Sequence, residues 1–245
     1  MSLFLATLGA SGLLLLAACA RSSRSGDPSQ DSTRAAERLA MVAAQVESRG
    51  LRDPHVLAAL RAVPRHEFVP EHLQGQAYDD GPLPIGAGQT ISQPYIVALM
   101  TEAVGLQPGE RVLDVGTGSG YQAAVLAHIT PHVFSIEIVA ELAQSARERL
   151  ARLGCGVQVR TGDGWAGWPE HAPFDAIILA AAPERVPPAL LQQLAPGGRL
   201  CLPIGGVNEA QELLVYTREP DGSFSERRLG AVRFVPMTGE AQRER

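Results

Sequence analysis

The stretch Val112-Leu113-Asp114-Val115-Gly116-Thr117-Gly118-Ser119-Gly120 decides the fold of this 245-residue chain. A short segment that suits a buried strand runs into three glycines at alternate positions, and a helical pattern over 121–128 follows. Glycine lets the backbone turn tightly and brings a ligand close to the N-terminus of the next helix. A dinucleotide-binding turn needs its third glycine three residues after the second, where this chain has Tyr121. We therefore predict a strand–turn–helix ligand site of another kind.

Helical and strand patterns alternate on both sides of this turn. The predicted helices are 34–48, closed by Gly50, then 54–62, capped by Asp53, and 94–104, 121–128, 140–153 and 188–194. The predicted strands are 111–115, 133–136, 157–160, 174–179, 199–203, 213–217 and 231–235. Strands separated by helices of about ten residues favour right-handed crossovers and a largely parallel sheet covered on both faces. The fold class is α/β, doubly wound and Rossmann-like, with an N-terminal helical extension.

The chain divides into an N-terminal segment, 1–33, and one domain, 34–245. Within that domain we expect N-terminal helices and a wrap over 34–92, and a ligand-binding α/β core over 93–238. Prolines interrupt 63–88, which is predicted to be irregular.

The N-terminal segment allows three interpretations. Residues 3–18 are apolar, Leu16-Ala17-Ala18-Cys19 resembles a bacterial lipoprotein cleavage box, and 21–33 has the composition of a linker. No Lys or Arg precedes the apolar run, whereas an export signal normally begins with positive charge. Arg21 and Arg24 follow it and would hold an uncleaved anchor with its domain in the cytosol. A start codon placed too far upstream is the third interpretation. We expect a cytoplasmic protein, the alternative being a lipoprotein anchored to the membrane through Cys19.

The basic residues exclude several classes of function. All 21 of them are arginine, so neither a phosphate-loop lysine nor Schiff-base chemistry is available. The net charge is −5 and no basic stripe stands out, which argues against nucleic acid as a partner. His128 and His132 are four residues apart, but Pro131 breaks the helix that would align them. We therefore predict no metal site.

Acidic residues stand where three successive predicted strands end. Asp114 precedes the glycines, Glu137 ends the second strand, and Asp163-Gly164 follows the third. One such acid is more often a surface charge or a cap, but three beside a glycine turn indicate a ligand site. Asp114 with the Gly-x-Gly-x-Gly pattern resembles motif I of S-adenosylmethionine-dependent methyltransferases. In that arrangement the second acid accepts hydrogen bonds from the ribose hydroxyls and the third from the adenine amino group. The resemblance implies S-adenosylmethionine as co-substrate, held by Asp114, Gly116, Thr117, Gly118, Gly120, Glu137, Asp163 and Gly164.

A second motif narrows the family. Thr90-Ile91-Ser92-Gln93-Pro94, with the preceding residues 82–88, closely resembles the signature of the protein-L-isoaspartate O-methyltransferases. The resemblance extends from about residue 34 to 238 and includes 162–165, 173–177, 194–198 and 232–236. It implies methyl transfer to the α-carboxylate of isoaspartyl residues in damaged proteins and peptides, which are the expected partners. It assigns Ser92 as the active-site residue and Thr90, Ile91, Gln93 and Pro94 as substrate-binding residues. It also matches Thr238 to a threonine that contacts the cofactor.

The chemistry suits these residues. A carboxylate is ionised at pH 7 and needs no strong general base, and a sulfonium is an activated methyl donor. Ser92 would aim the acceptor, although its position before Pro94 also suits a helix N-cap.

Two other functions remain open from the sequence. The first is a methyltransferase of this fold acting on a small-molecule carboxylate or hydroxyl. The second is a non-catalytic, membrane-tethered binding protein. Methylation of DNA bases is disfavoured, because Ala180-Ala181-Ala182-Pro183 replaces the Asn/Asp-Pro-Pro-aromatic loop that grips a flipped base.

Overall fold

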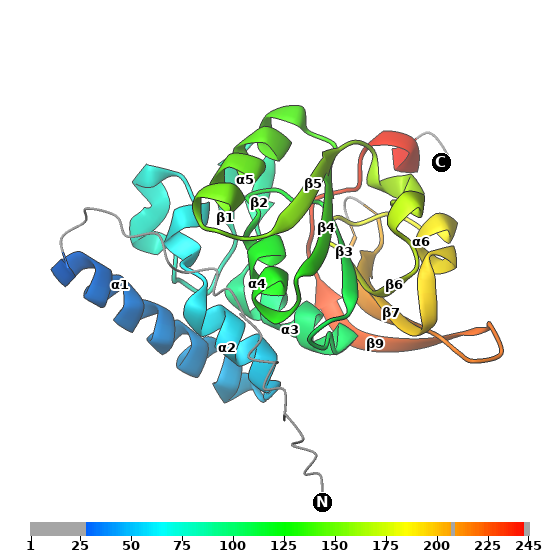
Figure 1. Ribbon diagram of the computed structural model, residues 1–245, viewed down its shortest axis with the longest axis horizontal. Helices are drawn as coiled ribbons and strands as arrows, with labels where there is room; N and C mark the ends of the chain where they lie inside the picture. The colour runs from blue at the N-terminus through cyan, green and yellow to red at the C-terminus, as the bar shows by residue number, and fades with distance from the viewer. Residues whose placement is uncertain (1–27, 207–208, 243–245) are drawn as a thin grey trace, which may run out of the picture.

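A seven-stranded sheet forms the centre of the computed structural model, which describes residues 28–206 and 209–242 (Figure 1). Its strands are β3 (Arg111–Val115), β4 (His132–Glu137), β5 (Val157–Thr161), β6 (Phe174–Leu179), β7 (Leu194–Ile204), β8 (Gln211–Arg218) and β9 (Phe224–Val232). The order is β5-β4-β3-β6-β7-β8-β9, parallel from β5 to β7 and antiparallel beyond. The strand order reverses between β3 and β6, the point at which such sheets bind ligands. The predicted α/β class is confirmed.

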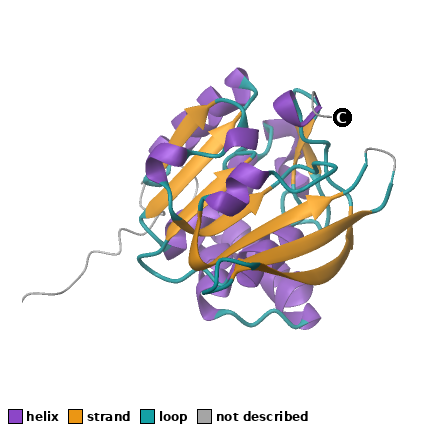
Figure 2. Cartoon of the chain, turned by 90° about the vertical axis from the view of Figure 1, so that its right-hand side faces the viewer, coloured by secondary structure: helices purple, strands orange, loops and turns teal. Residues whose placement is uncertain are grey.

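Apolar side chains cover both faces of this sheet. Along β6, Ala176 and Ile178 face one hydrophobic layer while Ile177 and Leu179 face the other, as the two-residue period of a strand requires. The first layer packs against α3 (Pro94–Val104) and α4 (Tyr121–Ile129), and the second against α6 (Pro188–Gln192). A further helix, α5 (Ala140–Arg152), lies beside β4 and β5. Figure 2 shows helices on both sides of the strands.

The N-terminal helices lie outside α4, away from the sheet (Figure 1). The first helix, α1, spans Pro28–Met41 and continues as a π-helical turn and a short 3-10 turn that end at Gly50, whose φ is 92°. It begins before the predicted residue 34, so 28–33 are helical and not linker. In α2 (Pro54–Ala62), the Asp53 carboxylate accepts hydrogen bonds from the backbone N–H groups of His55 and Val56, which confirms the predicted cap.

The segment 63–88 is more ordered than predicted. It contains two 3-10 helices (Arg65–Phe68, Glu71–Gln76) and β1 (Leu83–Gly86), which pairs with β2 (Gln89–Ile91) in an antiparallel hairpin. Proline usually argues against a strand, but a two-stranded sheet consists of edges, where a missing N–H is tolerated. Pro84 within β1, with Pro82 just before it, therefore obscured the hairpin in the sequence.

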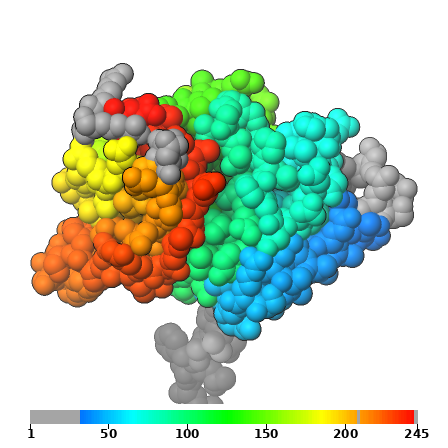
Figure 3. Space-filling model, turned by 180° about the vertical axis from the view of Figure 1, so that it is seen from behind, coloured from blue at the N-terminus to red at the C-terminus, as the bar shows by residue number. Residues whose placement is uncertain are grey.

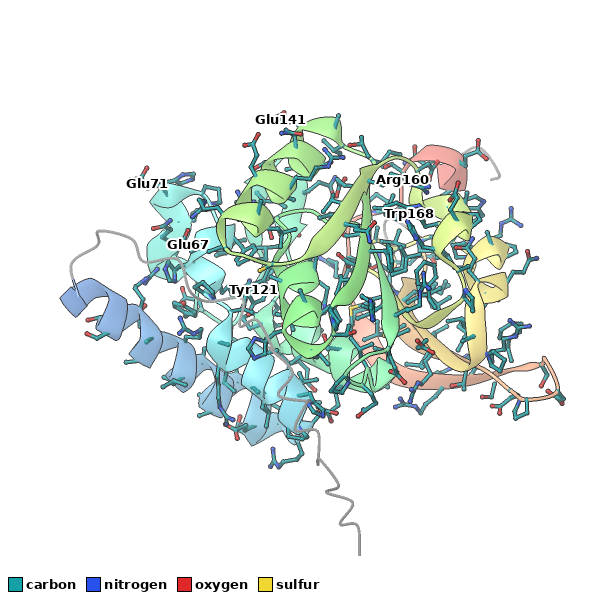
Figure 4. The ribbon with its side chains drawn as sticks, viewed as in Figure 1. Glu67, Glu71, Tyr121, Glu141, Arg160 and Trp168 are labelled. Carbon is teal, nitrogen blue, oxygen red and sulfur yellow. The ribbon has the colours of Figure 1, made fainter. Side chains whose placement is uncertain are left out.

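A buried arginine fixes this wrap to the core. Arg65 is fully buried, its Nε donates to the carbonyl of Ala77 at 2.8 Å, and its guanidinium lies 4.9 Å from the ring centre of Tyr121. Figure 4 labels Tyr121 on α4, close to the cyan segment that carries Glu67. Burial lowers the pKa of Arg65 to about 10 and raises that of Tyr121 to about 12, so the arginine stays charged at neutral pH.

The last predicted strand, 231–235, is wrong. Strand β9 begins at Phe224 and ends at Val232, and most of its residues are exposed, which removes the apolar alternation that reveals a strand. The Gln211 carboxamide then pairs with the backbone of Phe234, accepting from its N–H at 2.6 Å and donating to its carbonyl at 3.0 Å. The chain turns away from β8 and runs beside the end of β6, where Ala182 bonds to the backbone of Val235 and Met237. The sixth predicted helix, 188–194, also ends early, at Gln192, and its last residue begins β7.

The predicted apolar run 3–18, the lipoprotein box and Cys19 lie outside the described residues. Within 28–206 and 209–242, no helix has the length and apolarity needed to span a membrane. The division of the chain at 33 and 92 stays a prediction.

Candidate active site

A cavity of about 940 Å³, including its open mouth, lies at the carboxyl ends of β3, β4 and β6. Its walls come from the glycine turn, the ends of the strands, the β2–α3 junction and the C-terminal segment 235–238. In Figure 3 the red C-terminal segment lies directly beside the green residues of the core. The predicted residues that line the cavity are Thr90, Ile91, Ser92, Gly116, Thr117, Gly118, Glu137, Asp163, Gly164 and Thr238.

The glycine turn has the backbone that only glycine adopts easily. Gly116, Gly118 and Gly120 have φ values of 96°, 52° and 90°, all in the left-handed region. The first two line the cavity. Gly120 does not, and a Cβ there would lie 3.3 Å from the Leu150 side chain of α5. It therefore serves the packing of α4 against α5.

Glu137 braces the turn and also faces the cavity. Its side chain is almost fully buried, one oxygen accepts from the N–H of Gly118 at 2.7 Å, and the other accepts from the N–H of Val139 at 2.9 Å. Each carboxylate oxygen has a second lone pair, so both remain able to accept from a ligand. The position fits a pair of ribose hydroxyls.

Asp163 and Gly164, which follow β5, connect this strand to the C-terminal segment. The Asp163 carboxylate accepts from the N–H groups of Trp165, at 2.9 Å, and Glu240, at 2.7 Å. A Cβ on Gly164 would lie 2.2 Å from Cγ1 of Val115, so any side chain there must displace the Val115 side chain at the end of β3. The two residues thus line the cavity while holding two of its walls together.

Asp114 lies beneath the turn and does not line the cavity. It is fully buried, and its Oδ2 accepts from the Ser135 hydroxyl at 2.8 Å. Ser135 Oγ in turn lies 2.5 Å from Oγ1 of Thr117. Burial raises the pKa of Asp114 to about 7, the Ser135 hydrogen bond opposes this, and the nearby charge of Glu137 adds to it. Asp114 supports the turn from below.

The predicted substrate-binding residues divide into two groups. Thr90, Ile91 and Ser92 line the cavity, whereas Gln93 and Pro94 begin α3 and do not. The N-cap residue of α3 is Gln93, and no side-chain hydrogen bond caps this helix. The alternative interpretation of Ser92 as a helix cap therefore has no support.

Gln93 points away from the cavity. Its side-chain amide donates to the Asp80 carboxylate at 2.7 Å, and the same carboxylate also contacts Arg49. The Arg49 guanidinium lies 4.8 Å from the ring centre of Tyr95, the second residue of α3. These contacts hold the start of α3, and with it the position of Ser92.

Sequence reasoning missed the residues that support the site and the apolar ones that line it. Ser135 had a signal, because it is a polar residue inside an apolar strand. The lining residues had none, since their types occur throughout any core. They include Val97, Met100, Tyr121, Ile138, Val235 and Met237.

The charge of the site suits a cationic organic ligand. No ion pair involves Asp114 or Glu137 in the described part of the chain. The same part contains no group of three or more His, Cys, Asp or Glu side chains placed to hold a metal ion. S-adenosylmethionine carries a sulfonium charge and a ribose diol, and the donor set fits both.

Comparisons with known proteins agree with this fit. The family model for protein-L-isoaspartate(D-aspartate) O-methyltransferase matches residues 36–242. A protein-L-isoaspartate O-methyltransferase of Methylorubrum extorquens is 57% identical over 204 residues, which are 83% of this chain and 89% of that protein. One of Gloeobacter violaceus is 54% identical over 205 residues, 83% of this chain and 100% of that protein.

Solved structures give the same result. A protein-L-isoaspartate O-methyltransferase superimposes with a TM-score of 0.75 at 30% identity, covering 85% of this chain and 67% of the other. A putative Plasmodium falciparum enzyme of this name, in complex with S-adenosyl-L-homocysteine, has a TM-score of 0.72 at 26% identity, covering 82% and 98%.

Proposed function

This chain belongs to the protein-L-isoaspartate(D-aspartate) O-methyltransferase family, and we propose that its residues perform that reaction as follows. The chain is an S-adenosylmethionine-dependent enzyme that methylates the α-carboxylate of L-isoaspartyl residues in damaged proteins and peptides. The ester then closes to a succinimide, whose hydrolysis restores some normal aspartate. One observation supports this assignment of roles above all: Thr90, Ile91 and Ser92 line the same cavity as the glycine turn.

Ser92 is the residue that orients the acceptor. When bound, S-adenosylmethionine supplies an activated methyl group. The acceptor carboxylate is already ionised at neutral pH, so the protein needs no strong base near it. A hydroxyl that caps no helix is available to donate to one carboxylate oxygen and leave the other to react. Positioning and exclusion of water account for the remaining catalysis.

The cofactor residues follow from the cavity walls. Glu137 accepts from the ribose hydroxyls, Asp163 and the N–H of Gly164 bind adenine, and Thr238 completes the wall from the C-terminal side. Gly116, Thr117 and Gly118 bring the backbone close to the ligand. We assign supporting roles to the four predicted residues outside the cavity: Asp114 and Gly120 hold the turn, and Gln93 and Pro94 hold α3.

The partners are isoaspartyl proteins and peptides, as for the named relatives. Three further proposals rest on the sequence alone. They are that the protein does not bind nucleic acid, that 1–33 could tether it to a membrane, and that it is located in the cytoplasm. The family match from residue 36 supports treating 34–245 as the methyltransferase domain.

The decisive experiment is methyl transfer from labelled S-adenosylmethionine to an isoaspartyl peptide and to its aspartyl twin. We expect incorporation into the first alone, as a base-labile ester. A small-molecule acid methylated faster than the isoaspartyl peptide would favour the alternative, a methyltransferase of this fold with a small acceptor.

A further inference from the structure

Two buried carboxylates lie next to each other at the cofactor cavity. Asp114 on β3 is fully buried and Glu137 at the end of the neighbouring β4 is 5% exposed. Glu137 is satisfied by two backbone N–H groups, but Asp114 has no backbone donor, and its Oδ1 has no hydrogen-bond partner within 28–206 and 209–242. Burying a charge is costly unless donors or an opposite charge compensate for it. Whether Asp114 is ionised or protonated therefore depends on its single side-chain donor.

That donor is Ser135, a fully buried residue directly opposite Asp114 in the β3–β4 register. A hydroxyl has one proton, and an ionised carboxylate only accepts. When Asp114 is ionised, Ser135 donates to it, and the Thr117 hydroxyl, 2.5 Å away, donates to the Ser135 oxygen. The chain of bonds leads from the buried charge to a residue of the cavity wall.

We propose that Ser135 is a positioning residue that keeps Asp114 anionic beneath the glycine turn, and that this charge favours the sulfonium donor over the neutral thioether product. The proposal rests on the cofactor use of the family and adds a role for a residue outside the known signature. S-adenosylmethionine and S-adenosylhomocysteine share their adenosine and amino-acid groups and differ by one methyl and one positive charge. A negative charge near the sulfur therefore acts on one of them and hardly on the other.

Loss of the Ser135 hydroxyl removes the hydrogen bond that opposes the effect of burial on the pKa of Asp114. Burial already raises the pKa of Asp114 to about 7, and Glu137, the charged group that faces it from β4, adds to this effect. Without its donor the carboxyl binds its proton more tightly, so a smaller fraction of Asp114 is ionised at pH 8. Ser135→Ala and Asp114→Asn should then shift the two affinities in the same direction, since the first lowers the same charge that the second removes.

The test is calorimetric binding of both ligands at pH 8 to the full chain. We expect Ser135→Ala to weaken S-adenosylmethionine binding by roughly five- to twentyfold and S-adenosylhomocysteine binding by about twofold. Asp114→Asn should change the ratio of the two affinities similarly, and the double variant should add nothing further. Thr130→Val is the matched control, because Thr130 is also buried and donates to a backbone carbonyl, at the opposite end of the strands. Its affinity ratio should equal that of the parent.

Equal weakening of both ligands in Ser135→Ala would overturn the proposal and make the residue purely structural. Additive effects in the double variant would also overturn it. Should Ser135→Ala fail to fold, Asp114→Asn with an intact Ser135 tests the same charge. These are binding measurements, so a failure of isoaspartyl methylation would be a separate result.

Discussion

Glu137→Gln tests the ribose assignment with the smallest change of shape. The carboxylate accepts from the N–H of Gly118 and of Val139, and its remaining lone pairs face the cavity. Glutamine keeps one acceptor oxygen, so one backbone N–H faces an NH₂ group and the charge-assisted bonds to the ribose are lost. A hydrogen bond to a charged group contributes about 1.5–3 kcal/mol, which corresponds to roughly 10- to 150-fold in affinity.

Calorimetry with S-adenosylhomocysteine measures the loss, and thermal melting without ligand measures the damage to the turn. Glu141→Gln is the matched control, because Glu141 is exposed in the first turn of α5 (Figure 4) and does not line the cavity. We expect parental affinity from this control. A Glu137→Gln protein that melts early but binds the ligand as well as the parent would refute the assignment and leave Glu137 as a brace of the turn alone.

Three further outcomes follow from the site. Ser92→Ala should lower the turnover of an isoaspartyl peptide by roughly ten- to a hundredfold and leave the melting temperature unchanged, because Gln93 and not Ser92 occupies the N-cap of α3. An early melt at parental turnover would contradict this. Gly164→Ala should destabilise the fold by about 1–3 kcal/mol in denaturant titrations, because its Cβ would overlap Cγ1 of Val115; unchanged stability would show that the Val115 side chain can move aside. The pKa of Asp114 is raised from 3.8 to about 7 in the folded state, which therefore binds the proton more tightly than the unfolded chain. The stability that this group contributes is present below about pH 4 and is lost as the pH rises to about 7. Asp114→Asn should reduce the change in the free energy of unfolding between about pH 4 and pH 7. An unchanged slope over this range would show that other groups cause it.

The elements that the sequence predicted well are those with strong boundaries. The strands 111–115 and 174–179 and the helix 94–104 match β3, β6 and α3 residue for residue. Pro94 at the first position of α3, Gly116 after the last residue of β3 and Pro173 before the first residue of β6 mark these ends chemically. The hairpin and β9 had no such marks. The hairpin contains Pro84, and β9 is exposed on both faces, so neither shows the alternation from which a strand is recognised.

The sequence predicted which residues gather around the cavity, but not which of them line it and which lie behind its walls. Residue type and spacing located the acids and the glycines, because these positions follow strand ends that a parallel sheet brings to one edge. Thr90, Ile91 and Ser92 belong to or follow β2 of the separate hairpin, and only the family resemblance indicated them. Spacing does not tell which way a side chain points. Gln93 follows Ser92 by one residue, yet it pairs with Asp80 on the outside of the molecule. The direction depends on partners far away in sequence, and only the folded chain supplies them.

The acids at the three strand ends are not equivalent, and their hydrogen bonds explain why. Asp163 and Glu137 each accept from two backbone N–H groups and also line the cavity. Asp114 has one hydroxyl donor, Ser135, and no contact with the cavity, so its charge is the least compensated and the most sensitive to what lies above it. A ligand with a positive charge at the turn compensates for that cost when it binds. The same burial that destabilises the empty protein near neutral pH therefore strengthens its attraction for a cationic cofactor.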